Sequence, residues 1–301
     1  MNHKTLVSAM AWFLITTFAS ANDEAAILAL MTAGASVERD ESKPEKPVTL
    51  VSYNLRQVTD QGIQALKEIQ QLPAIEFVGS GDTAIGVSTL RALQGKTSLK
   101  RFAISYAKIS DESAKVLGTL NTLNVLALQV QIECSPAALQ EIFKLKNLQE
   151  LTLSDRLVND DVLGDVSKLP DLKTLNVRSL FVTDQGLASL KRSKGLKTLR
   201  IFLGPDVTRA GLRHLGGIPL KQLEVTYFNV SDAEIKELSN LSSITTLRLM
   251  NATKVTAAVI PDLAGMNGLK ELEIVGGKLT KAEMTALKKK LPDCKVIEGI
   301  Q

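Results

Sequence analysis

Side chains able to act as nucleophiles, general bases or metal ligands are sparse in this chain of 301 residues. It has two histidines, His3 and His214, and two cysteines, Cys134 and Cys294. Zinc ribbons, iron–sulfur sites and disulfide frameworks need several cysteines, and a histidine-based triad needs a histidine beside a nucleophile and an acid. His214 falls in a predicted helical segment, where we expect a solvent-facing or half-packed side chain rather than a catalytic one.

Three further patterns resemble parts of catalytic sites but lack the residues that would complete them. Cys134 precedes Ser135-Pro136, a predicted helix start whose dipole could lower the pKa of the thiol, yet no histidine lies near it in the sequence. Gly79-Ser-Gly81 and Gly216-Gly217 lack the residues that follow in phosphate-binding loops. Asp160-Asp161 lies at a predicted helix start, where acidic residues stabilise the helix. We therefore predict a protein that is not an enzyme and that binds no metal ion or cofactor.

One pattern, L-x-x-L-x-L, recurs along the chain and accounts for most of its regularly spaced leucines. Its clearest copies are Leu148–Leu153, Leu172–Val177, Leu196–Ile201, Leu220–Val225, Ile244–Leu249 and Leu269–Ile274. Upstream, the matching segments are Val48–Tyr53, Ala74–Gly79, Leu99–Ile104 and Leu123–Leu128, of which the first two fit more loosely. The copies start 24 to 26 residues apart, and Cys294–Ile297 opens a last, unfinished one. This period predicts ten repeats, each with one short strand.

The second half of each repeat predicts a short helix. Val182–Leu190 is its clearest copy, with Thr and Asp after the first valine. The predicted N-cap residues are Thr59, Ser110, Thr183, Thr208, Ser231, Thr256 and Thr280, and acidic residues follow in the first turn at Asp60, Asp111, Asp184 and Asp232. Apolar residues three apart turn one face of the helix inward, so each strand–helix unit can bury that face only against its neighbours.

These residues resemble the leucine-rich repeat family, in particular the V-T-D-x-G-L type common in exported proteins of planctomycete-like bacteria, and the repeats are also similar to those of F-box proteins. The resemblance covers residues 48–301 and implies a single curved α/β solenoid with one short parallel strand and one short helix per repeat. The chain departs from the family after each strand, where Asn, Cys or Thr is usual and residues such as Arg56, Arg156 and Leu180 stand instead. We therefore expect loose turns without a regular ladder of side chains between repeats.

The repeat map also separates the two cysteines. Cys134 and Cys294 are about six repeats apart, and parallel strands stack roughly 4.8 Å from one another, which gives about 30 Å between them. A disulfide needs Cα atoms within about 7 Å. We therefore predict that both cysteines are buried free thiols.

The first residues predict a secretory signal peptide over residues 1–21. Lys4 supplies the positive start, and the small residues Ala19-Ser20-Ala21 form a cleavage site. The apolar stretch Leu6–Phe18 is shorter than the ~20 residues that span a bilayer. We therefore expect an exported protein (periplasmic, at the cell surface or secreted) with no membrane insertion after the signal is cleaved.

The mature chain is predicted to contain a cap followed by the repeats. Residues 22–47 read as an N-terminal cap with a helix over Glu24–Ala33, a strand starting near Val37 and a turn before Pro47. Solenoids need such an element to cover their terminal repeat. Residues 48–301 form the leucine-rich-repeat domain.

Side chains that alternate with the buried apolar residues of each strand are expected on the concave face. The predicted central column is Ser52, Val78, Ala103, Ala127, Thr152, Asn176, Arg200, Glu224, Arg248 and Glu273. Because aromatic residues, Met and Arg are enriched in interface cores, we predict a surface for a protein or peptide partner at Arg178, Arg200, Phe202, Glu224, Tyr227, Arg248 and Met250. The alternative is structural, since opposite charges on strands about 5 Å apart can pair with one another.

The sequence favours an exported, non-catalytic module that binds a protein or peptide. A net charge of +4 is too small to indicate nucleic acid or an anionic membrane as the partner. One alternative is a structural, self-associating component of the cell envelope. Another, from the similarity to F-box proteins, is a substrate adaptor of a ubiquitin ligase, although the chain shows no F-box-like segment before the repeats and the signal peptide argues against it.

Overall fold

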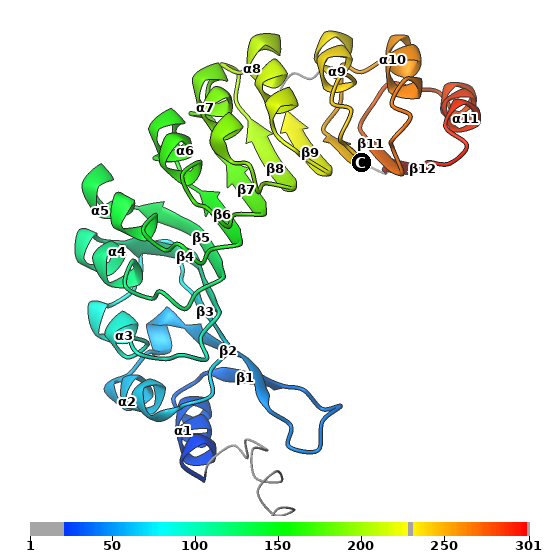
Figure 1. Cartoon of the computed structure of the whole chain (residues 1–301). Coiled ribbons are helices and arrows are strands. Elements are labelled where there is room, and N and C mark those ends of the chain that lie inside the picture. The colour runs from blue at the N-terminus through cyan, green and yellow to red at the C-terminus, as the bar shows by residue number, and fades with distance from the viewer. Residues whose placement is uncertain (1–20, 228–230, 300–301) are drawn as a thin grey trace, which may run out of the picture.

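The computed structural model describes residues 21–227 and 231–299 as a crescent of repeated strand–helix units (Figure 1). The predicted signal peptide lies outside the described residues except for Ala21, where the first helix begins. All strands form one sheet in chain order, β1 to β12. β1 and β2 are antiparallel, and every later pair of neighbours is parallel.

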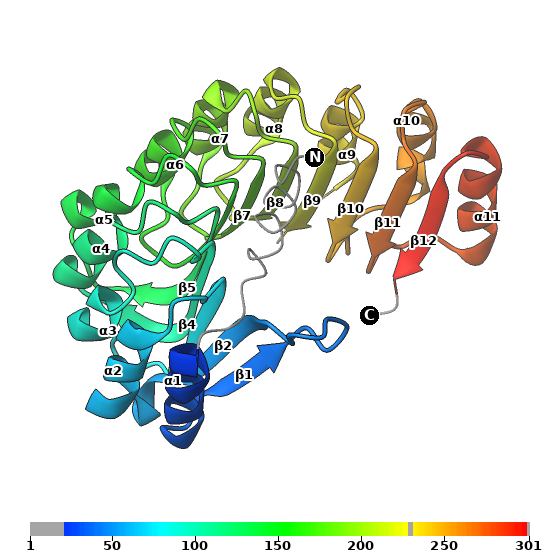
Figure 2. The same ribbon diagram turned by 60° about the horizontal axis from the view of Figure 1, so that its bottom comes forward.

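The strands line the concave side of the crescent (Figure 2). They are β1 Ser36–Arg39, β2 Val48–Asn54, β3 Ala74–Val78, β4 Arg101–Ile109, β5 Val125–Ile132, β6 Glu150–Ser154, β7 Thr174–Arg178, β8 Thr198–Leu203, β9 Gln222–Tyr227, β10 Thr246–Met250, β11 Glu271–Val275 and β12 Lys295–Gly299.

The helices cover the convex side. They are α1 Ala21–Thr32, α2 Asp60–Glu68, α3 Val87–Arg91, α4 Asp111–Leu117, α5 Pro136–Ile142, α6 Asp160–Val166, α7 Asp184–Ser189, α8 Arg209–Arg213, α9 Asp232–Leu238, α10 Ile260–Ala264 and α11 Lys281–Lys290, with short 3-10 turns at Leu55–Gln57, Leu190–Arg192, His214–Gly217 and Ala257–Val259. The predicted α/β solenoid, with ten strand–helix units followed by a last strand, is confirmed.

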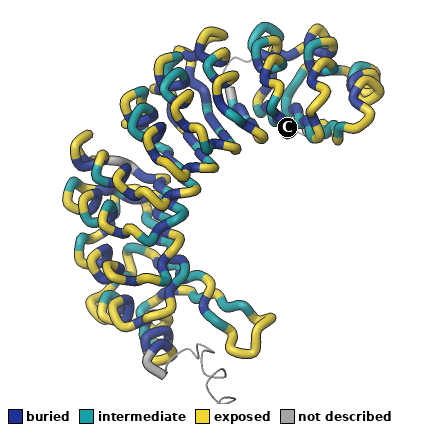
Figure 3. Tube along the Cα trace, viewed as in Figure 1, coloured by how far each residue is buried: buried dark blue, intermediate teal, exposed yellow. Residues whose placement is uncertain are grey.

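The core lies between the strand layer and the helix layer, and buried residues recur in every repeat (Figure 3). In β7, Leu175 and Val177 are buried while Asn176 between them is half-buried, because side chains alternate along a strand. Leu187 and Leu190 come from the helical half of the same repeat and are fully buried. Since each repeat buries its apolar residues against the next, the repeats form one continuous core.

The segment 22–47 forms the N-terminal end of the sheet. The expected helix and strand are present as α1 and β1, and β1 pairs with β2 in the antiparallel direction. Ile27 and Leu30 of α1 belong to the core. The hydroxyl of Tyr53 in β2 donates to the carbonyl of Ala33 at 3.0 Å, and Asp23 accepts from the backbone N–H of Gln70 at 2.6 Å. These contacts tie the segment to the first repeat.

The register of one strand differs from the prediction. Ser52 pairs with Glu76, and Glu76 pairs with Ala103, so Glu76 occupies the central column in place of Val78. The repeat that was aligned on Ala74 therefore begins two residues earlier, at Leu72, and the interval to Leu99 is 27 residues rather than 25. The extra length is absorbed after β3 and in β4, whose register shifts beside Tyr106, a residue with a φ of 53°.

The seven predicted N-cap residues are all N-caps, six of α-helices and one, Thr256, of a 3-10 turn. The acid that follows has a second role, because its carboxylate accepts two hydrogen bonds from the N-cap residue of the next repeat. Asp160 accepts from the backbone N–H of Thr183 at 2.8 Å and from its hydroxyl at 2.6 Å. The same paired bonds join Asp111 to Ser135, Asp184 to Thr208 and Asp232 to Thr256.

These bonds form a carboxylate ladder between helix starts, so the prediction of loose turns is wrong at these four junctions. The glycine of the V-T-D-x-G-L pattern makes room for it. A Cβ at Gly186 would lie 2.4 Å from Oδ1 of Asp160, and one at Gly211 would lie 2.2 Å from Oδ1 of Asp184. The carboxylate can reach the next N-cap only because a glycine faces it.

Where the acid is missing, another residue satisfies the N-cap. Ser231 and Thr280 follow repeats with Arg and Ala at the acid position, and each is bonded by a glutamate of its own helix. Glu234 accepts from the backbone N–H of Ser231 at 3.0 Å, and Glu283 accepts from that of Thr280 at 2.7 Å. These capping boxes satisfy the same donors without joining the repeats.

Candidate functional site

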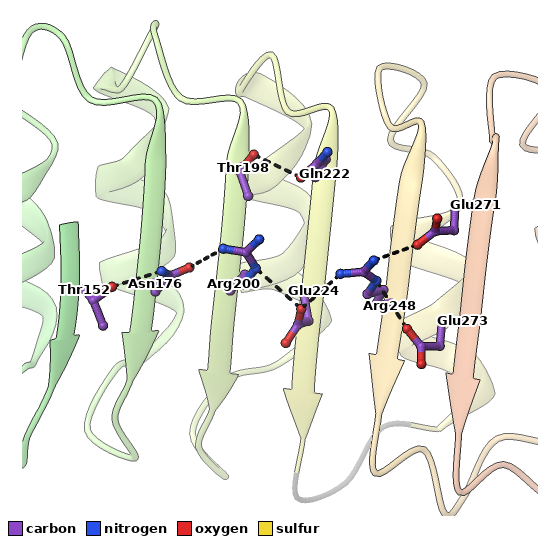
Figure 4. A network of polar contacts seen from close by, with 9 residues as sticks. All are labelled: Thr152, Asn176, Thr198, Arg200, Gln222, Glu224, Arg248, Glu271 and Glu273. Carbon is purple, nitrogen blue, oxygen red and sulfur yellow. Dashed lines mark hydrogen bonds and ion pairs between the residues drawn. The ribbon is translucent and has the colours of Figure 1, made fainter. Parts of the chain in front are cut away.

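The central column of the concave face carries a network of paired polar side chains in its second half (Figure 4). Arg200 lies 3.6 Å from Glu224, and its Nη1 donates to Asn176 at 3.2 Å. Arg248 lies 3.9 Å from Glu224, and its ion pairs with Glu271 and Glu273 measure 2.7 and 3.2 Å. The hydrogen bond to Glu271, and to a smaller extent the nearby carboxylates, raise the pKa of Arg248. The expected pairing of opposite charges across neighbouring strands is therefore present.

This polar ladder, Asn176–Arg200–Glu224–Arg248–Glu271/Glu273, changes how the predicted site residues are interpreted. Three of the seven, Arg200, Glu224 and Arg248, already have partners within the chain. A ligand that used one of these charges would have to displace a neighbouring side chain. Their role in the structure is thus to join β7–β11, each exposed pair contributing at most about 1 kcal/mol.

The remaining predicted residues do not form one row. Arg178 pairs in register with Phe202, and Phe202 pairs with Thr226, which in turn faces Met250. Tyr227 is in register with Leu203 instead, so it is displaced by one position from the row of Phe202, and its side chain lies outside the described residues. Met250 is half-buried at the end of β10. Arg178 and Phe202 are brought together.

Arg178 and Phe202 line a cavity at the carboxyl ends of β6, β7 and β8, which we call the strand-end pocket. Its volume is about 430 Å³, within the range of about 300–1,000 Å³ typical of ligand pockets. The lining residues are Ser154, Asp155, Arg156, Arg178, Ser179, Leu180, Phe181 and Phe202. Two cations and three large apolar side chains therefore share one small cavity.

The chain holds the apolar wall of this pocket in place. Buried Ser179 accepts a hydrogen bond from the backbone N–H of Phe181 at 3.1 Å, and Phe181 forms a parallel bridge with Asn159 of the preceding repeat. Val182, the next residue, is fully buried. With its neighbours fixed inward, the Phe181 side chain remains 50% exposed and Leu180 remains 42% exposed.

Other exposed apolar residues gather along the same edge of the sheet. Within the described ranges, the large hydrophobic side chains that are exposed are Leu28, Met31, Tyr106, Leu157, Leu180 and Phe181. The last four lie in β4 or in the segments that follow β6 and β7. Exposed apolar residues that cluster mark an interaction site more often than isolated ones do.

Sequence reasoning missed Arg156, Leu180 and Phe181 as parts of a site. Arg156 and Leu180 were noted only as departures from the residues usual after a leucine-rich strand. The available signal was the pair Leu180-Phe181 directly before Val182, since three consecutive large apolar residues cannot all point into the core.

A second cavity of about 430 Å³ opens on the convex side between α5 and α6. At this junction the acid position is occupied by Pro136, so no carboxylate reaches Asn159, the N-cap of α6. Cys134, Phe143 and Val162 are among the lining residues. The pKa of the Cys134 thiol is raised to about 11, mainly by burial and secondarily by the Asp111 carboxylate, which is opposite to the lowering considered from the sequence.

The remaining candidate groups are dispersed. Cys134 and Cys294 are free thiols; Cys134 is buried as predicted, whereas Cys294 is only half-buried. His214 is half-buried at the start of a 3-10 turn in the helix layer. Within residues 21–227 and 231–299, no group of three or more His, Cys, Asp or Glu side chains could hold a metal ion. In the same ranges no helix combines the length and the apolar character that a bilayer span requires.

Comparisons with known proteins find the fold but no relative in sequence. No protein-family model and no curated protein matches the chain. Among solved structures, the internalin InlF of Listeria monocytogenes is 17% identical, with a TM-score of 0.52 over 93% of this chain and 90% of that one. TLR13 in its complex with ssRNA13 is 15% identical, with a TM-score of 0.55 over 83% of this chain and 36% of TLR13. The chain thus spans about a third of TLR13 and most of the internalin, and its fold is the leucine-rich-repeat solenoid.

Proposed function

We propose that this chain is an exported, non-catalytic binding protein that holds a protein or peptide partner on its concave side, at the strand-end pocket. The observation that carries the proposal is a contrast between two sets of arginines. Arg200 and Arg248 are engaged in the polar ladder. Arg156 and Arg178 are exposed, and among the described residues neither has an ion-pair partner.

The composition of the pocket supports a protein partner. Arg and aromatic residues carry a large share of the binding energy in protein interfaces, and here they lie beside exposed Leu180 and Phe181. The curved sheet offers an extended surface around the pocket. Because Arg200, Glu224 and Arg248 are paired internally, we place the centre of the site at β6–β8 rather than across the whole polar ladder.

A nucleic acid is the other ligand to weigh, since the TLR13 structure contains ssRNA13. Tight binding to a phosphate backbone uses about 6–10 contacts from cationic side chains. The strand-end pocket offers two arginines, and its other charged residue is Asp155. Its apolar wall has no counterpart in backbone phosphates, so the pocket favours a protein.

Export is part of the proposal and rests on the signal-peptide pattern of residues 1–21. Terminal sequencing of the protein recovered from outside the cytoplasm is expected to begin at Asn22. A protein that begins at Met1 in that fraction would contradict cleavage.

The test of binding is a pull-down from the envelope fraction of the source organism with three forms of the purified protein. The pocket variant carries Arg178→Glu and Phe181→Ser. The control carries Arg209→Glu and Leu28→Ser, which change one exposed cation and one exposed apolar residue of the helix layer. Circular dichroism establishes that all three forms are folded.

We expect a partner that the wild type and the control retain and the pocket variant loses. A partner held equally by all three forms would refute the strand-end pocket as the binding site. A protein that captures nothing but itself, with self-association lost in the pocket variant, would instead support the structural, self-associating alternative.

A further inference from the structure

The strand-end pocket has an electrostatic imbalance that indicates which ligand it fits. Its charged residues are Arg156, Arg178 and Asp155, which leaves one positive charge in excess. Oδ1 of Asp155 accepts the backbone N–H of Leu157 at 2.7 Å, so this carboxylate is engaged within its own loop. The two guanidinium groups are thereby available to an anion from outside.

Arginines elsewhere in the chain show what these two lack. Arg56 pairs with Asp82 at 3.1 Å, Arg213 pairs with Glu237 at 2.8 Å, and Arg39 pairs with Glu24 at 2.8 Å. In each case an acidic side chain from another part of the fold supplies the partner. Carboxylates bind a guanidinium through two parallel hydrogen bonds, the geometry for which Arg is better suited than Lys.

The apolar wall restricts the ligand further. Leu180, Phe181 and Phe202 line the same cavity, and the first two expose about half of their surface. Burying them on binding is favourable by roughly 25 cal/mol per Å² of apolar surface. A small inorganic anion would leave this wall in water, whereas a peptide with an apolar side chain next to a carboxylate would cover it.

We infer that the strand-end pocket binds a short acidic segment of a second protein, in which Asp or Glu adjoins a large apolar residue. The carboxylate lies between Arg156 and Arg178, and the apolar side chain packs on Leu180 and Phe181. This inference rests on the proposed binding function and deepens it by naming the ligand chemistry. Because Ser179 and Val182 fix the wall before the ligand arrives, little ordering of this segment is required on binding.

The test is selection of a random peptide library, displayed on phage, against the purified full chain. The wild type is compared with Arg156→Gln/Arg178→Gln and with the matched control Arg91→Gln/Arg209→Gln, which removes two exposed charges from α3 and α8. We expect the wild type and the control to enrich peptides with Asp or Glu next to Leu, Ile or Phe. A synthetic copy of the enriched peptide should bind the pocket variant about tenfold or more weakly, in fluorescence anisotropy, because charge-assisted contacts are lost.

Three results would overturn the inference. The first is enrichment of peptides without carboxylates, or equal affinity of the enriched peptide for wild type and pocket variant. The second is no enrichment at all, which refutes a peptide pocket but leaves the proposed function to the pull-down. The third is binding of a fluorescent single-stranded oligonucleotide that the pocket variant loses, which would assign the two arginines to phosphate.

Discussion

The carboxylate ladder between helix starts predicts that Asp160 and Gly186 depend on each other, although they belong to different repeats. Asp160→Ala removes two hydrogen bonds to Thr183, which measure 2.8 and 2.6 Å. Hydrogen bonds to a charged group contribute about 1.5–3 kcal/mol each when buried, and these groups are half-buried. We therefore expect Asp160→Ala to lower the free energy of unfolding by about 2 kcal/mol in total.

Gly186→Ala acts on the same bonds from the other side. The new Cβ would lie 2.4 Å from Oδ1 of Asp160, so the carboxylate must move away from Thr183. Ala is favoured over Gly in a helix by about 1 kcal/mol, which offsets part of the loss, and a net destabilisation of about 1 kcal/mol remains. Once Asp160 is alanine the conflict is gone, and the same substitution should be neutral or slightly stabilising, since the other close atoms are methyl groups of Val182 and Leu163.

The double variant should therefore be about 1.5 kcal/mol more stable than the sum of the single variants predicts, well beyond the roughly 0.5 kcal/mol expected of independent sites. Urea unfolding followed by circular dichroism measures the effect, with hydrogen exchange of the Thr183 amide as a local reporter, because repeat arrays can unfold in parts. Asp161→Ala is the matched control, since Asp161 is exposed and lies outside the ladder. Additive free energies, or an equal effect of the control, would refute the ladder as a stabilising device.

Two further predictions concern groups with shifted pKa values. Because burial raises the pKa of Cys134 to about 11 and Cys294 is half-exposed, we expect iodoacetamide at pH 8 to alkylate Cys294 before Cys134 in the folded protein, as followed by peptide mass spectrometry; equal rates in the folded state would contradict the burial of Cys134. The hydrogen bonds from Thr280 hold the pKa of Glu283 below its ordinary value of 4.5, so this carboxylate stabilises the fold above that pH and the stabilisation is lost as the pH falls through the depressed pKa. The urea midpoint of the wild type should exceed that of Glu283→Gln at pH 7, and the difference should shrink between pH 5 and pH 3; a difference independent of pH would show that the charge of Glu283 is not responsible.

Most of the fold follows from the period of the apolar residues, because a recurring leucine pattern leaves few alternatives to a stacked solenoid. The N-caps were predictable for the same reason, since Ser or Thr recurs at one offset from each strand. The register of β3 was not. Val48–Tyr53 and Leu72–Phe77 are 24 residues apart, but the next interval is 27, and even spacing placed the strand two residues too late. An insertion beside a residue of positive φ such as Tyr106 leaves no signal in the apolar pattern.

The carboxylate ladder was missed because its two partners are 23 or 24 residues apart and each has a sufficient local explanation. An aspartate in the first turn is accounted for by the helix dipole, and a threonine before it by capping. Only the stacking of Asp160 on Thr183 shows that one group serves both repeats. Gly186 completes the argument, because a glycine inside a short helix is otherwise unfavourable.

The candidate site was predicted in its region but not in its centre, and charge pairing explains the difference. Alternating signs along a parallel sheet make a conspicuous sequence pattern, yet strands about 4.8 Å apart bring such charges together, so Arg200, Glu224 and Arg248 satisfy one another. A cation with no acid on the adjacent strand has no such partner. Arg178 fits that description: its register neighbours are Ser154 and Phe202. In a solenoid of known register, the arginines that face neutral neighbours are therefore better candidates for ligand contact than those that complete an alternating row.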